Sequence, residues 1–275
     1  MVFPADKNIF PPPDWANLQP GSGDFVKAAV RVPILYYHRV DDRLSPAIGV
    51  SPQAFAAQME YLRKKNYRSI SFEQLADYFM KGRSLPSRPV IISFDDGYLD
   101  NFTRAYPILK QNGFRASIFL VSDYIGLRSE WAGCTGEDVA PLMSREQLLI
   151  LIREGFELGS HTRRHTNLTA VPPEEARREV EEGKLNLENL LQKPIRSFAY
   201  PFGNFNPDII EGVRKAGFTT ARTVHTDNTH CLEDLLTLRC VKLNGRTPWL
   251  KFKYYLTALY HWETRRHERR KSGRG

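Results

Sequence analysis

Cysteine is scarce in this chain of 275 residues, and the few that occur form no recognisable pattern. The three cysteines, Cys134, Cys231 and Cys240, are an odd number and include no Cys-x-x-Cys pair. Such spacing supplies neither a disulfide framework nor the thiolate pairs of a structural zinc site. A hydrophobic core therefore has to hold the fold, and a chain of this length can bury a substantial one within a single domain.

Long hydrophobic runs are missing as well. No stretch approaches the roughly 20 apolar residues that cross a bilayer. The first 30 residues contain no apolar segment of signal-peptide length, and five prolines interrupt them: Pro4, Pro11, Pro12, Pro13 and Pro20. These absences predict a protein that is cytoplasmic or peripheral to a membrane.

The net charge of +8 is concentrated at one end of the chain. Six of the 39 basic side chains lie in the last dozen residues, from Thr264 to Gly275. No aromatic residues are interleaved with these cations to stack on bases, so we expect no nucleic-acid partner. Peripheral contact of this basic tail with an anionic membrane stays open.

Composition divides the chain into three parts. Residues 1–29 read as a Pro-rich arm, residues 30–248 as the main domain, and residues 249–275 as an amphipathic helix over Trp249–Tyr260 followed by the basic tail. Within the main domain, seven apolar, strand-like runs alternate with helical patterns. Helix starts are marked by Ser51-Pro52 and by the capping boxes Ser71/Gln74 and Ser144/Gln147. This alternation predicts an α/β fold whose parallel sheet forms a barrel that is closed or nearly closed.

Unusual polar residues follow several of the predicted strands. The apolar run Val90–Ile92 leads to two adjacent carboxylates, Asp95 and Asp96. Two carboxylates so close to each other and to an apolar strand cannot both be ionised unless a cation or a shared proton compensates their charge. His38 follows an earlier strand, and His161 and His165 follow a later one. The carboxyl ends of the strands form the active-site face of α/β barrels, so we expect these side chains to meet.

Two histidines and one carboxylate form a ligand set suited to a catalytic divalent metal ion. His161 and His165 are four positions apart, a spacing that places both imidazoles on one side of a helical turn. Zinc suits this set best, and cobalt, nickel or iron are possible. The second carboxylate could take a proton from a water whose pKa the ion lowers to about 7, and His38 could protonate a leaving group.

Three segments resemble, in order, the first three motifs of the polysaccharide deacetylases, the NodB-homology domain of carbohydrate esterase family 4. They are Ser93-Phe-Asp-Asp-Gly97, His161-Thr-Arg-Arg-His165 and Phe198-Ala-Tyr-Pro-Phe-Gly203. The resemblance implies a deformed (β/α)7 barrel that hydrolyses the C–N bond of N-acetyl groups on N-acetylglucosamine-type sugars.

The same resemblance implies roles for individual residues. Asp95 matches the general base, and Asp96, His161 and His165 match the metal ligands. The turn formed by Tyr200, Pro201 and Phe202 matches the substrate groove, where the Phe202 backbone N–H would help to hold the oxyanion.

The sequence departs from the family pattern at three places, one of which is the fourth motif, whose Asp-Trp is not found near Thr223 to Asn228. Ala199 stands where the third motif usually has an arginine beside the base, and Leu238-Arg239-Cys240 lacks the histidine of the late Leu-x-His motif. Leu35-Tyr-Tyr-His-Arg-Val40 resembles an N-terminal element of the circularly permuted poly-N-acetylglucosamine deacetylases, which implies His38 as the general acid. Arg239 is the residue suggested as partner of Asp95.

The expected partner is an N-acetylated glycan, and alternatives stay open. The same scaffold resembles enzymes that remove other acyl groups, from a lipid-linked sugar or from acetyl esters. A catalytically inactive, glycan-binding relative is the alternative from a different class, because Ala199 and the missing late histidine remove parts that the family uses.

Overall fold

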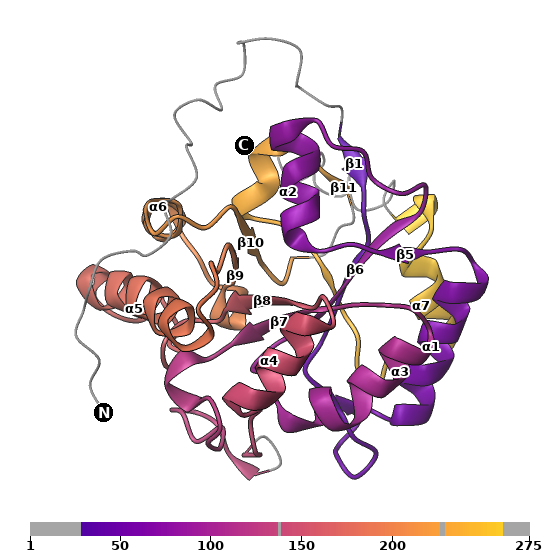
Figure 1. Ribbon diagram of the computed structural model, residues 1–275, viewed down its shortest axis with the longest axis horizontal. Helices are drawn as coiled ribbons and strands as arrows, with labels where there is room; N and C mark the ends of the chain where they lie inside the picture. The colour runs from indigo at the N-terminus through magenta and orange to yellow at the C-terminus, as the bar shows by residue number, and fades with distance from the viewer. Residues whose placement is uncertain (1–28, 137–138, 226–228, 261–275) are drawn as a thin grey trace, which may run out of the picture.

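Parallel strands form the centre of the molecule, as Figure 1 shows for the computed structural model, which describes residues 29–136, 139–225 and 229–260. The hydrogen-bonded order of the main sheet is β10-β9-β8-β7-β6-β2-β12. These strands are β2 (Ile34–Tyr37), β6 (Pro89–Phe94), β7 (Ser117–Leu120), β8 (Glu157–Ser160), β9 (Ser197–Ala199), β10 (Thr220–Arg222) and β12 (Val241–Lys242). The short β5 (Arg68–Ser69) also pairs with β6.

The chain segment at residues 238–242 brings the two ends of this sheet together. Leu238 forms a parallel bridge with Arg222 of β10, and Val241 then pairs with Leu35 of β2. One segment therefore contacts both edges of the sheet, which curls into a nearly closed barrel. The predicted (β/α)7 architecture is confirmed, since structural relatives share it.

Helices cover the outside of the curled sheet. Their bounds are α1 (Pro52–Lys64), α2 (Phe72–Lys81), α3 (Tyr106–Gln111), α4 (Arg145–Arg153), α5 (Pro173–Leu191), α6 (Pro207–Lys215) and α7 (Trp249–Tyr255). Ser51 caps α1, and both predicted capping boxes are formed, at Ser71/Gln74 and Ser144/Gln147. In Figure 1, α1, α3 and α7 lie together at the right of the sheet and α5 lies at the left.

Short elements complete the described chain. They are β1 (Val30–Arg31) paired antiparallel with β11 (Thr229–His230), β3 (Arg39–Val40) paired with β4 (Gly49–Val50), the π-helical turn η2 (Asn101–Ala105), and the 3-10 turns η3 (Ser122–Tyr124), η5 (Pro201–Gly203) and η6 (Leu232–Leu236). The helix predicted over residues 249–260 is shorter than expected, because α7 ends at Tyr255 and Thr257 turns back to donate its backbone N–H and its hydroxyl to the Tyr254 carbonyl.

The central strand β6 is buried on both faces, in agreement with its apolar run Val90–Ile92. All six residues of β6 are buried. Its Val90 and Ile92 belong to one hydrophobic cluster and Ile91 to another, so alternate side chains enter two layers of core. Among the described residues, no helix combines the length and the apolar character needed to cross a membrane. The predicted Pro-rich arm, apart from residue 29, and the basic tail from residue 261 lie outside the described residues.

Candidate active site

A cleft of about 420 Å³ opens at the carboxyl ends of the strands. Five residues predicted from the sequence meet there: His38, Asp95, Asp96, His161 and His165. The other residues lining the cleft are Tyr36, Ala47, Ile48, Tyr98, Trp131, Ala132, Gly133, Cys134, Tyr200, Phe202, Val224 and Lys242. A cleft of this size is large enough for a sugar-sized ligand.

Asp96, His161 and His165 form a cluster with the geometry of a metal site. Each offers one ligand atom, and the three atoms lie within 4.8 Å of one another. Asp96 Oδ1 is 3.6 Å from His161 Nε2 and 3.4 Å from His165 Nε2. Two ligand atoms at about 2.0–2.2 Å from one tetrahedral zinc ion lie about 3.3–3.6 Å apart. The three residues therefore fit a divalent ion.

Both imidazoles are prepared to act as ligands. His161 Nδ1 lies 2.7 Å from the Ala199 carbonyl, which accepts only if Nδ1 carries the proton, and this leaves the Nε2 lone pair for the cluster. Burial lowers the pKa of His161, and burial together with the nearby His161 lowers the pKa of His165 to about 2. Neutral imidazole is the form that binds a metal ion.

Aromatic rings hold the second histidine in place. The His165 ring stacks on Trp131 at 4.9 Å between centroids and meets the Phe202 ring edge-on at the same distance.

Backbone strain is concentrated at the cleft. Of the six described non-glycine residues with positive φ, four lie at the site: Asp96, Thr162, His165 and Phe202. Each such conformation costs of the order of 1–3 kcal/mol and persists where surrounding contacts impose it.

Helix α5 holds the loop that carries the two histidines. Arg163 pairs with Asp123 and Glu182, and Glu179 accepts from the backbone N–H of Arg164. The loop also lies directly against Gly183, where a Cβ atom would come within 2.8 Å of the backbone of Thr162 and Arg163. The absence of a side chain at Gly183 therefore allows the loop that carries His161 and His165, called the metal loop below, to lie against helix α5.

Asp95 pairs with Arg222 of β10 rather than with Arg239, so the structure corrects the base partner suggested from the sequence. Burial by itself raises the pKa of Asp95, but Arg222, with His161 and His38, outweighs it and lowers the pKa to about 2. Arg239 lies between Leu238 and Cys240, which are fully buried, and is itself partly exposed. The Cys240 thiol contacts the Arg222 guanidinium, so this side of the segment faces the pair.

The position of Arg222 explains how Ala199 can replace an arginine. Arg222 and Ala199 are partners in the parallel register of β10 and β9, so they lie side by side at the same level of the barrel. The guanidinium is fully buried and lies over the rings of Tyr36 and Phe119, at 4.4 and 5.3 Å from their centroids. The sequence offers one signal for this residue, since it is the lone charged residue in the run Thr219–Val224.

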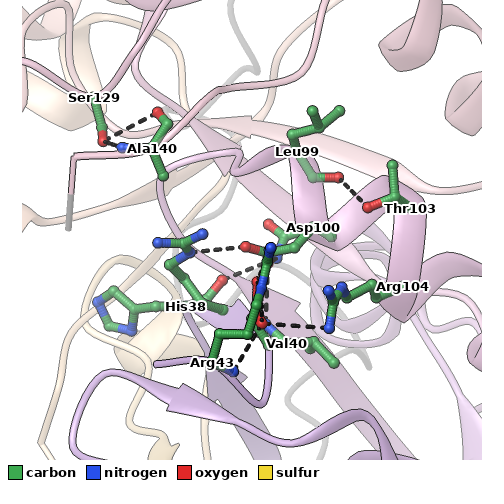
Figure 2. Close-up of polar contacts among 12 residues, drawn as sticks. His38, Val40, Arg43, Leu99, Asp100, Thr103, Arg104, Ser129 and Ala140 are labelled. Carbon is green, nitrogen blue, oxygen red and sulfur yellow. Dashed lines mark hydrogen bonds and ion pairs between the residues drawn. The ribbon is translucent and has the colours of Figure 1, made fainter. Parts of the chain in front are cut away.

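His38 lies on the cleft wall at the end of β2, and the loop that follows Asp96 holds its backbone. Asn101 Nδ2 donates to the His38 carbonyl at 2.9 Å. Asp100 accepts from the backbone N–H of Val40 at 3.0 Å, beside His38 in Figure 2, and from Arg39 Nε at 2.7 Å. The sequence reasoning did not single out these residues. Burial lowers the pKa of His38 to about 4, with Lys242 and Arg222 opposing its charge further and Asp95 favouring it.

The turn at residues 200–203 forms another part of the cleft wall. Phe202 and Tyr200 line the cleft, whereas Pro201 is buried and is not among the lining residues. The Tyr200 hydroxyl donates to the Leu236 carbonyl at 3.0 Å, so it points away from the cleft. Phe202 is 56% exposed, so its ring is available to a ligand. The oxyanion role of its backbone N–H stays a prediction.

The long loop between β7 and α4 forms the rim of the cleft. Its residues 131–134 line the cleft. Ser129 holds the base of this loop. Its hydroxyl accepts from the Ala140 N–H at 2.9 Å and donates to the Ala140 carbonyl at 3.3 Å (Figure 2). Its backbone N–H donates to the same carbonyl at 2.9 Å.

Comparison with known proteins supports the chemistry that this geometry suggests. The family model described as polysaccharide deacetylase matches residues 82–221, about half of the chain. The chain belongs to the polysaccharide deacetylase family. The chain is therefore that of a polysaccharide deacetylase-type hydrolase, and it carries a candidate Asp-His-His metal site.

Individual relatives agree with this placement. The chain is 26% identical over 177 residues to a poly-β-1,6-N-acetyl-D-glucosamine N-deacetylase of Staphylococcus epidermidis, an alignment that covers 61% of this chain and 58% of that protein. The structure of IcaB from Ammonifex degensii matches with a TM-score of 0.71 and 25% identity, over 83% of this chain and 97% of that one. The deacetylase PplD of Streptococcus pyogenes matches with a TM-score of 0.72 and 21% identity, over 84% and 100%, and shows the shared fold.

Proposed function

We propose that this deacetylase removes N-acetyl groups from N-acetylglucosamine-type sugars in a polysaccharide or oligosaccharide, with the help of a divalent metal ion. Asp96, His161 and His165 hold the ion, with zinc as the first choice and cobalt, nickel or iron as alternatives. The observation that supports this most is the adjacency of the metal-ligand cluster and a separate, ionised carboxylate, Asp95.

Asp95 acts as the general base in this proposal. A bound divalent ion polarises the amide carbonyl and lowers the pKa of water, which makes proton removal feasible near neutral pH. Asp95 is kept ionised by Arg222, so its carboxylate is ready to accept that proton. The ion pair also restricts the side chain of Asp95 to one orientation.

His38 acts as the general acid, and the low pKa of its imidazole means that it is neutral before the reaction begins. It therefore has to gain a proton during the reaction. A protonated Asp95 is the stronger acid of the two, because its pKa is about 2 and that of His38 is about 4, so it can supply this proton. The proton taken from water thus passes by way of His38 to the nitrogen that leaves as an amine.

The names of the relatives support a β-1,6-linked N-acetylglucosamine polymer as the first substrate to test. The exposed ring of Phe202 gives the cleft an apolar surface on which a sugar can stack. The absence of an arginine at position 199 no longer argues for an inactive relative, since Arg222 supplies the guanidinium beside Asp95.

The test compares acyl release from matched substrates. The metal-depleted protein is reloaded with zinc or cobalt and incubated with β-1,6- and β-1,4-linked N-acetylglucosamine oligomers, with an N-formylated lipid-linked sugar and with acetylated xylan. We expect acetate release from the oligomers, and only in the reloaded protein. Formate release alone would assign the site to another acyl group, and cleavage of acetyl esters alone would assign it to another kind of bond. No release from any substrate by the metal-loaded protein would favour a glycan-binding protein without activity.

A further inference from the structure

The surface formed by α7 and the end of α1 differs from the rest of the described chain in its exposed side chains. Seven large hydrophobic side chains are exposed in the described residues, and three of them, Trp249, Leu250 and Leu259, lie within eleven positions of one another. Leu250 is 76% exposed, more than any other of the seven. Single exposed apolar residues are ordinary, but such clustering is typical of a binding surface.

The indole of Trp249 is held rigidly at this surface. It packs edge-on against Tyr61 of α1 at 5.5 Å and stacks on the buried Phe252 at 5.4 Å. The Lys253 ammonium lies 5.2 Å from the Trp249 ring and 5.5 Å from the Tyr61 ring. Because α1 and its neighbours fix this ring, it can enter a partner with little loss of conformational entropy.

Cations surround the exposed apolar side chains. From Asn244 to Tyr260 the chain has no acidic residue, and Arg246, Lys251 and Lys253 are basic. The end of α1 adds three exposed basic residues, Arg63, Lys64 and Lys65, of which Lys64 pairs with Glu60. Trp, Tyr and Leu beside lysines form the composition of segments that lie in the interface of an anionic bilayer.

We propose that this surface, made of Trp249, Leu250, Lys251 and Lys253 with Arg63 and Lys65, docks on an anionic lipid bilayer. Trp249 and Leu250 enter the headgroup region, and the lysines contact the lipid phosphates. The residues that precede α7 are bonded to the cleft wall, since Gly245 donates to the Gly49 carbonyl and Asn244 to the carbonyl of Ala47, which lines the cleft. Docking therefore places the cleft near the membrane surface, and the inference stands independently of the acyl group that the enzyme removes.

The test is co-sedimentation of the full chain with vesicles of phosphatidylcholine, with and without phosphatidylglycerol. We expect binding to the anionic vesicles only, weakened by salt. The variant Leu250→Glu/Lys251→Glu should raise the lipid concentration for half-maximal binding by at least about tenfold. Leu127→Glu, a matched change at a leucine that is 57% exposed elsewhere, should shift it by less than about twofold.

Several outcomes would overturn the proposal. The first two are equal binding to neutral and anionic vesicles, and no binding to either kind. The third is that the double variant binds anionic vesicles as tightly as the unaltered protein. The fourth is that double-stranded DNA of matched charge displaces the protein from anionic vesicles as well as added anionic lipid does. Melting temperatures and acetate release from soluble oligomers report whether the variants are folded, so loss of docking and loss of catalysis are measured separately.

Discussion

Arg222 and Asp95 form a buried ion pair between two strands of the barrel, although 127 positions separate them in the sequence. Both side chains are nearly inaccessible to solvent, at 1% and 5% exposure. The pair therefore ties the carboxylate proposed as general base to the far edge of the sheet. Removing either partner leaves an uncompensated buried charge, which is costly.

Replacing Arg222 by methionine should reduce kcat by at least about tenfold, because the pKa of Asp95 rises once burial is no longer opposed. It should also lower the free energy of unfolding by about 3–5 kcal/mol. Steady-state acetate release and denaturant unfolding measure the two effects. Arg239→Met is the matched control and should stay within about twofold of the unaltered rate; a larger loss in the control than at Arg222 would restore Arg239 as the partner.

The register of β9 and β10 allows a rescue experiment. Ala199 lies beside Arg222, so Ala199→Arg in an Arg222→Ala background should recover part of the lost kcat by offering a guanidinium from the neighbouring strand. The metal content of each variant, measured by atomic absorption, should be equal. If Ala199→Arg raises kcat in the Arg222→Ala background but not in the unaltered protein, then a guanidinium beside Asp95 is what catalysis needs, whether β9 or β10 carries it.

Asn101 should position His38. Removing its hydrogen bond to the His38 carbonyl in Asn101→Ala should lower kcat by about five- to tenfold, since one such bond is worth about 1 kcal/mol. The KM and the metal content should not change, and the acidic limb of the pH–rate profile should move. Thr103→Ala, in the same π-helical turn but bonded only to Leu99, is the control and should have little effect. A change in KM or metal content alone would mean that Asn101 supports the fold and not the acid.

Gly183 and Gly212 make a matched pair for testing how α5 holds the metal loop. Alanine in a helix normally stabilises by about 0.5–1 kcal/mol relative to glycine, and Gly212→Ala in α6 should do so because nothing lies within 4 Å of the new Cβ. Gly183→Ala should instead displace residues 162–163 and weaken zinc binding by about 10–100-fold. Competition with a chromogenic chelator measures the affinity, and unchanged affinity in Gly183→Ala would contradict the account.

The metal-free protein should lose stability as the pH falls below neutral. The pKa of His38 is about 4 in the fold and 6.5 without it, so the unfolded chain binds more protons between these values. From pH 7 to pH 5 this histidine alone should lower the free energy of unfolding by about 1–2 kcal/mol. Thermal unfolding in the presence of a chelator measures it, with His38→Gln as the control that removes this share of the dependence and leaves the share of His161 and His165. A melting temperature that rises on acidification would contradict the predicted loss of stability.

Local patterns in the sequence predicted most of the fold and the reacting groups. The serine and glutamine of each capping box are three residues apart and bond to each other's backbone, so this contact is local in sequence. The apolar run before Asp95 likewise indicates a strand by its own composition. Such features can be predicted without knowing the tertiary structure. The link between Arg222 and Asp95, and that between Asn101 and His38, depend on which strands become neighbours and in what register. That information is not contained in any single segment, which is why Arg239 was suggested in place of Arg222.

The most direct test of the proposed mechanism is acetate release by the zinc-loaded Asp95→Asn variant, with bound zinc measured in the same sample. Asparagine keeps the shape of the side chain but cannot accept a proton, so the rate should fall by at least about a hundredfold while zinc stays bound. Asp96→Asn, one position along, should lose zinc itself. An undiminished rate in zinc-loaded Asp95→Asn would contradict the account.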